Sequence, residues 1–549
     1  MTALATPRRY PTLSKSGFVV KASASGSGQQ LADYTSAFEG ASLSTRMGSW
    51  GLRGSGPNLE IDASLYSLRE RSRELVRNSP LADGAMDTWA SQLVGPGIVP
   101  RFVGFSDEDT RQMVRETWDD WVEEADADGR TDFYGLQYLI AQTLFQSGEC
   151  LAVFRPRSLR EGLTVPLQIQ IIEPDHLDGA FSSSHEIAAP LTGNPIRMGI
   201  EFSRTTGRRV AYWMSRRHPG DGMFDQPVRI PAELVMHIYR ARRPGQLRGI
   251  PELSSVIVKM HDLDQYTDAE LVRKKTAALF AGFIENPDAE NSMFDTKTGN
   301  SVETGDEYQM ARLDPGIMQE LRPGQKVHFS EPADVGSSYL PWIQQQMRDI
   351  ARGMGITYEQ LTGDLSGVNF TSIRAGLLEF RRRITVMQTR VMVHQFCRPV
   401  QQTWMRFAVL SGALDLPDFD KPQTRRKYMR THWRPPAWEW VQPDREGAAA
   451  AQAIRDGLTS RESVASERGE DVGEIDRQQS RDNDRARTNG LRYDTDTGEG
   501  NGGKPVAGKP ATVDTTDPAS AQGFKPGELA YDEETGDMYE LTVDGWRRA

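Results

Sequence analysis

The strongest constraint on the fold is a helical pattern that runs for 40 residues, from Thr371 to Leu410. At 1.5 Å per residue, a helix of that length would be roughly 60 Å long if straight. Counted to Ser411, it carries seven arginines and a single acid, Glu379. Exposed helices usually mix both signs, which allows i,i+4 ion pairs. The acidic partners of this helix must therefore come from elsewhere in the assembly, or the arginines contact DNA or are simply solvated.

The arginines for which we expect partners in another subunit or another domain are Arg374, Arg381, Arg382 and Arg383. Direct DNA contact and plain solvation are the two alternatives. Near the end of the pattern, Pro399 lacks the N–H that a helix interior needs and predicts a kink.

A Gly-rich segment, residues 353–370, precedes this helix and predicts a non-helical loop. A shorter helical pattern, residues 339–352, leads into the loop from the other side. The segment ARGMGITYEQLTGDLSGVNFTSIRAGLLEF contains none of the groups that an active site needs. We therefore expect a loop that is presented by rigid helices and has a mechanical role.

Upstream, helical patterns followed by strand patterns predict one α+β unit over residues 59–248. Apolar runs separated by turn residues begin after Gly148 and favour an antiparallel sheet. A single helix opened by Pro251 is predicted over 249–282. Its basic cluster, Arg273, Lys274 and Lys275, lies near the C-terminal end, where cations complement the helix dipole.

The remaining segments are shorter or poorer in pattern. Residues 283–338 predict short strands and turns, and 444–490 predict short helices. Residues 1–58 have the composition of a flexible arm. A low-complexity tail, 491–549, ends in a pattern that predicts a small hairpin.

Composition limits the function classes. The formal charge of −11 gives no global basic footprint of a tight DNA binder, although DNA could still pass through a conduit that avoids many phosphate contacts. No apolar run approaches the ~20 residues of a membrane span, and no secretory signal is evident, so we expect a soluble protein that stays in the cytoplasm. The two cysteines, Cys150 and Cys397, predict buried free thiols.

Motifs for catalysis are missing from the sequence. It contains no P-loop, nucleophile elbow, HExxH or CxxC pattern. The nearest approach to a metal or acid–base site is His176 with Glu173, Asp175 and Asp178. A turn at the end of a buried strand explains that run equally well, and we favour it. We also expect His237 to be a core or interface histidine, because it alternates with apolar residues. We predict no catalytic residue, cofactor or metal.

Several segments, in this order, resemble the portal proteins of lambda-type tailed bacteriophages: LRERSRELVRNSPLADGAMDTWASQLVGPGI, SGECLAVFRPR, LQIQIIEPDHLD, GIEFSRTTGRRVAYWM, RIPAELVMHIYRARRPGQLRGIPELSSVI, LRPGQKVHFSEP and the loop segment quoted above. The resemblance covers residues from about 34 to 480, and the tail after about 490 departs from it.

The resemblance implies a ring, usually of twelve subunits, at one vertex of the head. It also implies a multidomain α+β subunit with a wing, a helical stem, a small β-containing clip, a tunnel loop, a long kinked helix and a helical crown. The corresponding ranges are 59–248 (wing), 249–282 and 339–352 (stem), 283–338 (clip), 353–370 (tunnel loop), 371–443 (long helix and return to the wing) and 444–490 (crown).

In function, the resemblance implies a non-enzymatic channel for packaging and ejecting double-stranded DNA. The implied partners are other copies of the chain, the terminase large subunit, the major capsid and scaffolding proteins, and head-completion or adaptor proteins. The protein would assemble in the host cytoplasm and remain in the virion. Candidate DNA contacts in the loop are Asp364, Ser366 and Asn369, and candidate channel residues of the stem are Arg273, Lys274 and Lys275.

Two other function classes remain open from the sequence. One is a capsid-associated processing enzyme, either a maturation protease or a nuclease, which would need a nucleophile–base pair or a carboxylate metal cluster. The other is a DNA-binding adaptor without a closed ring.

Overall fold

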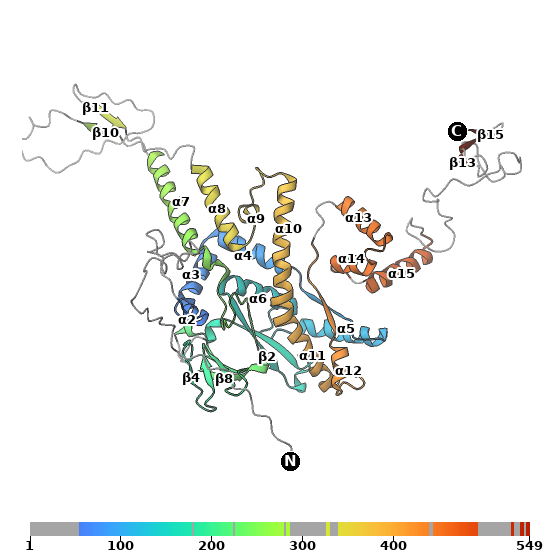
Figure 1. The fold of residues 1–549 in the computed structure, drawn as a ribbon, viewed down its shortest axis with the longest axis horizontal. Coiled ribbons are helices and arrows are strands. Elements are labelled where there is room, and N and C mark those ends of the chain that lie inside the picture. The colour runs from blue at the N-terminus through green and yellow to red at the C-terminus, as the bar shows by residue number, and fades with distance from the viewer. Residues whose placement is uncertain are drawn as a thin grey trace, which may run out of the picture. The chain divides into compact units, whose positions relative to one another are not determined.

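The chain divides into two compact units, Met1–Pro435 and Pro436–Ala549. The computed structural model (Figure 1) describes residues 54–177, 181–222, 226–278, 282–285, 326–329, 339–438, 443–470, 472–491, 529–531, 538–542 and 545–548. The predicted arm up to residue 53, most of the predicted clip and most of the predicted tail lie outside the described residues.

Helices make up the larger part of the first unit. Their bounds are α2 Pro57–Asp62, α3 Leu65–Asn78, α4 Pro80–Leu93, α5 Glu108–Glu124, α6 Phe133–Ser147, α7 Ile257–Ala278, α8 Tyr339–Met354, α9 Tyr358–Thr362 and α12 Pro422–Tyr428. Local sequence signals explain several of these bounds. Asp107 caps α5 by accepting from the Thr110 N–H, and Asp132 caps α6 by accepting from the Gly135 N–H. Gly148 ends α6 in the left-handed conformation.

The predicted long helix is confirmed as one helical run, made of α10 (Phe370–Met387), a π-helical segment η9 (Gln388–Cys397) and α11 (Arg398–Ser411). A π-helix of 10 residues is unusual, because this form mostly occurs as single-turn bulges. Pro399 follows directly, in the first turn of α11. The departure from α-helical geometry therefore lies in the turns before the proline.

The predicted stem helix 249–282 starts later than expected. Pro251 opens a 3₁₀ turn, η6 (Glu252–Ser255), and α7 begins only at Ile257. The buried Glu252 side chain explains the turn, because its carboxylate lies 3.2 Å from Arg240 and 3.0 Å from Arg242. These two ion pairs hold the chain against the end of the preceding strand before the α-helix starts.

Antiparallel strands form the sheets of the first unit. A three-stranded sheet has the order β3-β2-β9, and a five-stranded sheet has the order β4-β5-β6-β7-β8. The strand bounds are β2 Glu149–Pro156, β3 Leu167–Ile172, β4 Ile187–Ala188, β5 Pro195–Arg197, β6 Ile200–Phe202, β7 Arg209–Met214, β8 Val228–Pro231 and β9 Val235–Tyr239. The β6–β7 hairpin turns through Thr205, Thr206 and Gly207.

Two further strand pairs are antiparallel. Strand β1 (Val99–Phe102) pairs with β12 (Thr431–Arg434), which returns the chain after the long helix to the first helices. Strand β10 (Gly282–Glu285) pairs with β11 (Lys326–Phe329) between α7 and α8. The described residues thus form a mixed helix-and-sheet chain, in agreement with the predicted fold class. Within them, no helix combines the length and apolar character needed to cross a membrane.

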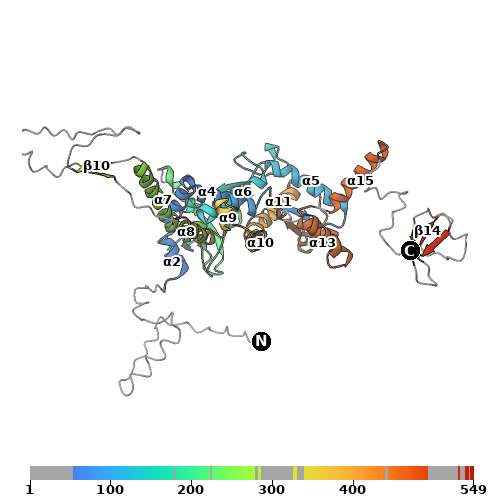
Figure 2. The same ribbon diagram turned by 90° about the horizontal axis from the view of Figure 1, so that it is seen from above.

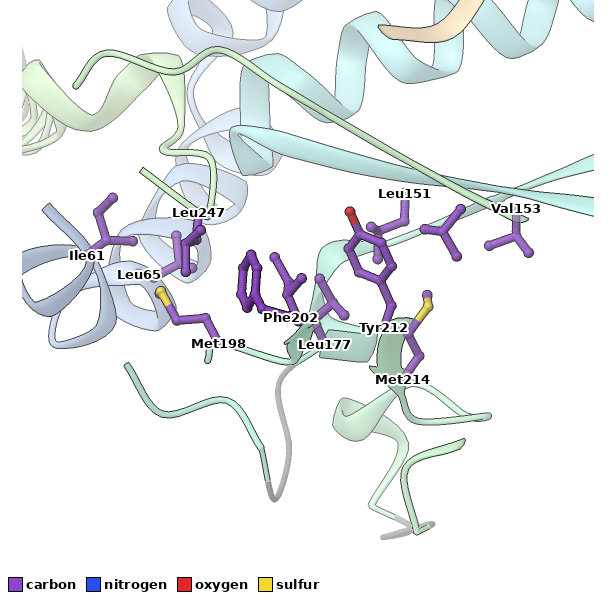
Figure 3. Packing of buried hydrophobic residues seen from close by; sticks show 12 residues of the cluster. Ile61, Leu65, Leu151, Val153, Leu177, Met198, Phe202, Tyr212, Met214 and Leu247 are labelled. Carbon is purple, nitrogen blue, oxygen red and sulfur yellow. The ribbon is translucent and has the colours of Figure 1, made fainter. Parts of the chain in front are cut away.

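One apolar core joins the two sheets to the first helices (Figure 3). Ile61 of α2 and Leu65 of α3 lie with Leu247 at one end, and Leu151 and Val153 of β2 lie toward the other. Between them lie side chains from the five-stranded sheet and its neighbouring turns, namely Leu177, Met198, Phe202, Tyr212 and Met214.

A second core is aromatic and anchors the end of the long helix. Trp404 of α11 packs edge-on against Trp118 of α5, with ring centroids 4.9 Å apart. Trp121 and Phe133 complete the cluster beside Trp118. The Trp121 indole N–H donates to the Leu167 carbonyl at 2.8 Å, which ties the cluster to β3. All four aromatic side chains are fully buried.

The second unit contains α13 (Pro443–Arg455), α14 (Arg461–Glu467) and α15 (Val472–Thr488). Ser460 caps α14 by accepting from the Ser463 N–H. The predicted terminal hairpin is present, and a third strand extends it. The bounds are β13 Leu529–Tyr531, β14 Met538–Thr542 and β15 Gly545–Arg548, and both pairings are antiparallel.

We predict that Trp404→Ala lowers the free energy of unfolding of the first unit by about 3–5 kcal/mol, because it empties the centre of the aromatic core. Urea denaturation followed by tryptophan fluorescence and circular dichroism would measure this loss. Leu410→Ala is the matched control on the same helix, since Leu410 is 83% exposed, and it should change stability by less than about 0.5 kcal/mol. Equal losses from both variants would contradict the packing role of Trp404.

Candidate functional site

The predicted loop 353–370 lies between α8 and α10, and part of it is helical. The expectation of a non-helical segment is wrong for Tyr358–Thr362, which form α9. Thr357 and Gln360 form a capping box there. The Thr357 hydroxyl accepts from the Gln360 N–H at 3.2 Å, and the Gln360 amide oxygen accepts from the Thr357 N–H at 3.0 Å. This Thr-x-x-Gln spacing is a known signature of a helix start, so the sequence did contain the signal.

The remaining loop is held by its own polar side chains. The Asp364 carboxylate accepts from the Ser366 N–H at 3.0 Å and from its hydroxyl at 2.6 Å. These hydrogen bonds lower the pKa of Asp364, so its charge persists at neutral pH. Asn369 caps α10 by accepting from the Ser372 N–H at 2.8 Å. Between them Leu365 is 63% exposed.

The structure thus places the three predicted DNA contacts, Asp364, Ser366 and Asn369, on one short segment. Asp364 and Ser366 form one turn, and Asn369 ends the segment. Their role toward DNA stays a prediction.

A polar cavity of about 490 Å³ lies at the base of the loop, between α8, α9 and α10. The Arg383 guanidinium packs against Gly355, which has a φ of +82°, in space that a Cβ atom would occupy. On the other side, Arg348 lies over the ring of Tyr358, 5.2 Å from its centroid. Any side chain at position 355 would therefore displace Arg383 and strain the backbone.

The arginines of the long helix do not share one environment. Arg374 and Arg381 are half-buried, whereas Arg382 and Arg383 are exposed. The helix's own acid, Glu379, pairs with Arg352 of α8 at 3.2 Å, an interaction between two exposed groups. Of the four predicted interface arginines, Arg382 and Arg383 have no ion-pair partner within the described part of the chain.

The predicted basic cluster of the stem is largely neutralised within its own helices. Arg273 lies 2.6 Å from Glu270, and Lys274 lies 3.8 Å from the same carboxylate. Lys274 also lies over the ring of Tyr339, which begins α8. Lys275 is exposed. Arg273 is therefore paired within α7, and Lys274 links α7 to α8, roles that the sequence did not reveal.

A buried carboxylate joins the three-stranded sheet to the segment that leads into α7. Glu149 is fully buried at the start of β2. It accepts from Arg248 at 2.8 Å, from the Gly249 N–H at 2.6 Å and from His237 at 2.9 Å. Burial alone would raise the pKa of Glu149, but the Arg248 charge and the His237 hydrogen bond outweigh it and lower the pKa to about 2.

His237 is a buried structural histidine, as predicted. Burial lowers the pKa of His237 and outweighs the opposing effect of Glu149, so the imidazole is neutral at physiological pH. Its Nε2 faces Glu149, and the ring packs 4.6 Å from that of Tyr239.

The acidic run near His176 is organised differently from the predicted cluster. His176 itself bonds to the Ser215 carbonyl at 2.7 Å, and Asp178 lies outside the described residues. Instead His218 joins Glu173 and Asp175, and the ligand atoms of these three residues lie within 4.8 Å of one another. His218 lies 42 residues further along the chain than His176, and no local pattern pointed to it.

Two arginines of α3 occupy this acidic cluster. Arg73 donates to both oxygens of Asp175 and to Glu173, and Arg69 lies 3.5 Å from Asp175. Burial would raise the pKa of Asp175, but the Arg73 hydrogen bonds and the two cationic charges outweigh it and lower the pKa. The guanidinium groups already supply the countercharge that a metal would bring, so the cluster fits an ionic joint between α3 and the end of β3.

Cys150 and Cys397 are free, fully buried thiols, as predicted. Burial raises the pKa of both thiols far above neutrality, which leaves them unreactive as nucleophiles.

When the chain is compared with known protein families, one family matches most of the described first unit. The sequence profile of the family described as phage portal protein, lambda family, matches residues 43–388. The matched range begins before α2 and ends at the first residue of η9, so it includes the α8–α9–α10 segment. The resemblance seen in the sequence is confirmed.

Three curated relatives are similar over most of the chain. A probable portal protein of Halomonas phage phiHAP-1 is 28% identical, covering 76% of this chain and 80% of its own. The portal protein of Escherichia phage N15 is 26% identical, with 80% and 89% covered. Portal protein B of Escherichia phage lambda is 24% identical, with 79% and 87% covered.

We predict that Glu149→Gln lowers the free energy of unfolding at pH 7 by about 3–5 kcal/mol, because Arg248 loses its buried countercharge. The pKa of Glu149 falls from 4.5 to about 2 on folding, so its contribution is complete above about pH 4.5 and is lost as the pH falls toward 2. Denaturant unfolding at pH 7, 5 and 3.5 would therefore show a difference between wild type and variant that shrinks with acidification.

Glu186→Gln is the control for this substitution, because Glu186 is exposed. It should leave stability within about 0.5 kcal/mol of wild type at each pH. A Glu149→Gln variant as stable as this control would contradict the role of the buried joint.

Proposed function

Because the chain belongs to the lambda family of phage portal proteins, we propose that it forms a ring-shaped channel at one capsid vertex through which double-stranded DNA is packaged and ejected. The match over residues 43–388 carries this proposal, since it spans the sheets, both helices of the predicted stem and the loop between α8 and α10. Portal proteins are structural proteins of the virion, and this chain is not an enzyme.

The proposed division of the subunit follows the order of its elements. The sheets and helices of residues 59–248 form the wing, and α7 and α8 form the stem. The β10–β11 pair belongs to the clip, which lies between the two stem helices in the chain. Residues 353–370 form the tunnel loop, the helical run from α10 to α11 leads back to the wing, and α13 to α15 form the crown.

We expect the loop to guide DNA by weak contact. Asp364 keeps a negative charge at neutral pH and would repel phosphate, while Ser366 and Asn369 offer only neutral polar groups. Each phosphate contact made by a cation adds salt-dependent affinity. A channel lined by acids and amides would therefore let DNA slide, whereas a basic lining would hold it.

The proposed assembly involves several partners. Copies of this chain form the ring, with twelve subunits as our expectation. The ring would dock the terminase large subunit during packaging and contact the major capsid and scaffolding proteins during assembly in the host cytoplasm. Head-completion or adaptor proteins would bind it afterwards. A processing enzyme is excluded by the family, and a ringless DNA-binding adaptor is the alternative that imaging would reveal.

Negative-stain electron microscopy of the purified full chain tests the proposal directly. We expect closed rings with a central channel. A population of monomers or open aggregates at micromolar concentration, with no rings under any salt condition, would overturn the proposed channel.

Deleting Gly363–Val368 tests the loop separately from the ring. The deletion removes Asp364 and Ser366 but leaves α9 and the cap of α10 in place, so we expect rings of normal size. Particles assembled with this variant should package or retain less DNA, measured as the ratio of filled to empty heads. Asp364→Ala alone should leave rings intact and affect DNA retention less than the deletion does. Wild-type yields of stable, filled heads from the deletion variant would contradict a role for the loop.

A further inference from the structure

Two exposed helix faces lie at opposite ends of a row of helices in the first unit. Figure 1 shows the order α7, α8, α10, and Figure 2 keeps that order from above. The inner contacts of the row are made by α8, which pairs with α7 through Lys259–Asp349 at 2.7 Å and reaches α10 through Arg352–Glu379 at 3.2 Å. The outer sides of α7 and α10 are left without a neighbour from this row.

The outer face of α7 combines two aliphatic side chains with an acid. Val258 and Val272 are 69% and 54% exposed. Asp268 is also exposed on this side of the helix, and it has no ion-pair partner within the described ranges. The other side of α7 is occupied, since Tyr266 packs 4.6 Å from the Trp342 ring of α8. We call Val258, Asp268 and Val272 the α7 outer face.

The outer face of α10 combines aliphatic side chains with a cation. Leu378 and Val386 are 48% and 53% exposed, and Arg382 lies between them at i+4 spacing. Residues at this spacing share one side of a helix. The opposite side is buried through Phe380, Ile384 and Met387. We call Leu378, Arg382 and Val386 the α10 outer face.

We propose that the α7 outer face of one subunit packs against the α10 outer face of the next copy of this chain. This inference rests on the proposed ring. A cyclic assembly needs two different, complementary patches on each subunit, one at either side, so that every copy uses both. The two faces meet this requirement, because each presents apolar side chains with charges of opposite sign.

Charge complementarity selects a second copy as the occupant. Asp268 of α7 and Arg382 of α10 have no ion-pair partner within the described residues, and they could pair across the interface, which would fix register and direction. The exposed aliphatic side chains beside them would be removed from water by the same contact. The acidic partners expected for the long helix would then come, for Arg382, from the neighbouring subunit's α7.

Charge reversal on one face at a time tests this contact. In Asp268→Arg both faces become basic, and in Arg382→Asp both become acidic. Like charges then face each other across the contact, so we expect each variant to form at least about tenfold fewer rings at a concentration where wild type is assembled. Negative-stain counting and mass photometry would measure this, and circular dichroism would confirm that each variant is folded.

Mixing the two variants provides the decisive measurement. The basic α7 face of one variant then meets the acidic α10 face of the other, and their two unchanged faces also match. We expect an equimolar mixture to recover rings in which the variants alternate. The double variant Asp268→Arg/Arg382→Asp should also form rings alone. Asp120→Arg, an exposed acid on α5, is the control and should assemble like wild type.

The outcomes separate the two proposals. If wild type forms no rings, the proposed function itself fails. If wild type forms rings and either face variant also forms them alone, or if neither the mixture nor the double variant recovers them, the α7–α10 contact is overturned while the ring stands.

Discussion

The first unit depends on the buried carboxylate of Glu149. Glu149 lies where α6 ends and β2 begins. Its carboxylate accepts hydrogen bonds from Arg248 and Gly249, in the segment that leads into α7. The backbone there is packed without spare room, since a Cβ on Gly148 would overlap Ile250, and one on Gly249 would overlap the Gly148 carbonyl. Arg248 extends the joint by donating to the Pro174 carbonyl, next to the Asp175–Arg69 pair. The three-stranded sheet and the segment that leads into α7 are therefore joined by charge as well as by apolar packing.

Local patterns were sufficient to predict most helices and strands, because caps, periodicity and turns act within a few residues. Asp107, Asp132 and Gly148 are residue types that favour helix ends, and each lies at a helix end in the structure. The start of α7 was missed because Glu252 is held by arginines that precede it in a turn, an effect that overrides helix propensity. The ten-residue π-helix left no recognisable sequence signal, since its residue types are ordinary for a helix.

The candidate site was predictable as a segment but not as a set of contacts. Glycines and polar residues located the loop, and the family resemblance supplied its proposed role. Which side chains meet there depends on long-range packing: Arg352 and Glu379 are 27 residues apart, and Arg73 and Asp175 are 102 apart. Pairing over such distances leaves no periodicity to detect. The basic cluster on α7 illustrates the consequence, because Glu270, inside the same helix, neutralises cations that looked available for a channel.

The burial of both cysteines has a consequence for the redox behaviour of the assembly. These are the only two thiols in the sequence, and neither reaches solvent nor forms a thiolate at neutral pH. An oxidant that attacks thiolates would find no target on the folded chain. Subunits that assemble in a reducing compartment could therefore enter an oxidising compartment without forming disulfide cross-links. Many copies held side by side would then keep the same covalent structure in both compartments.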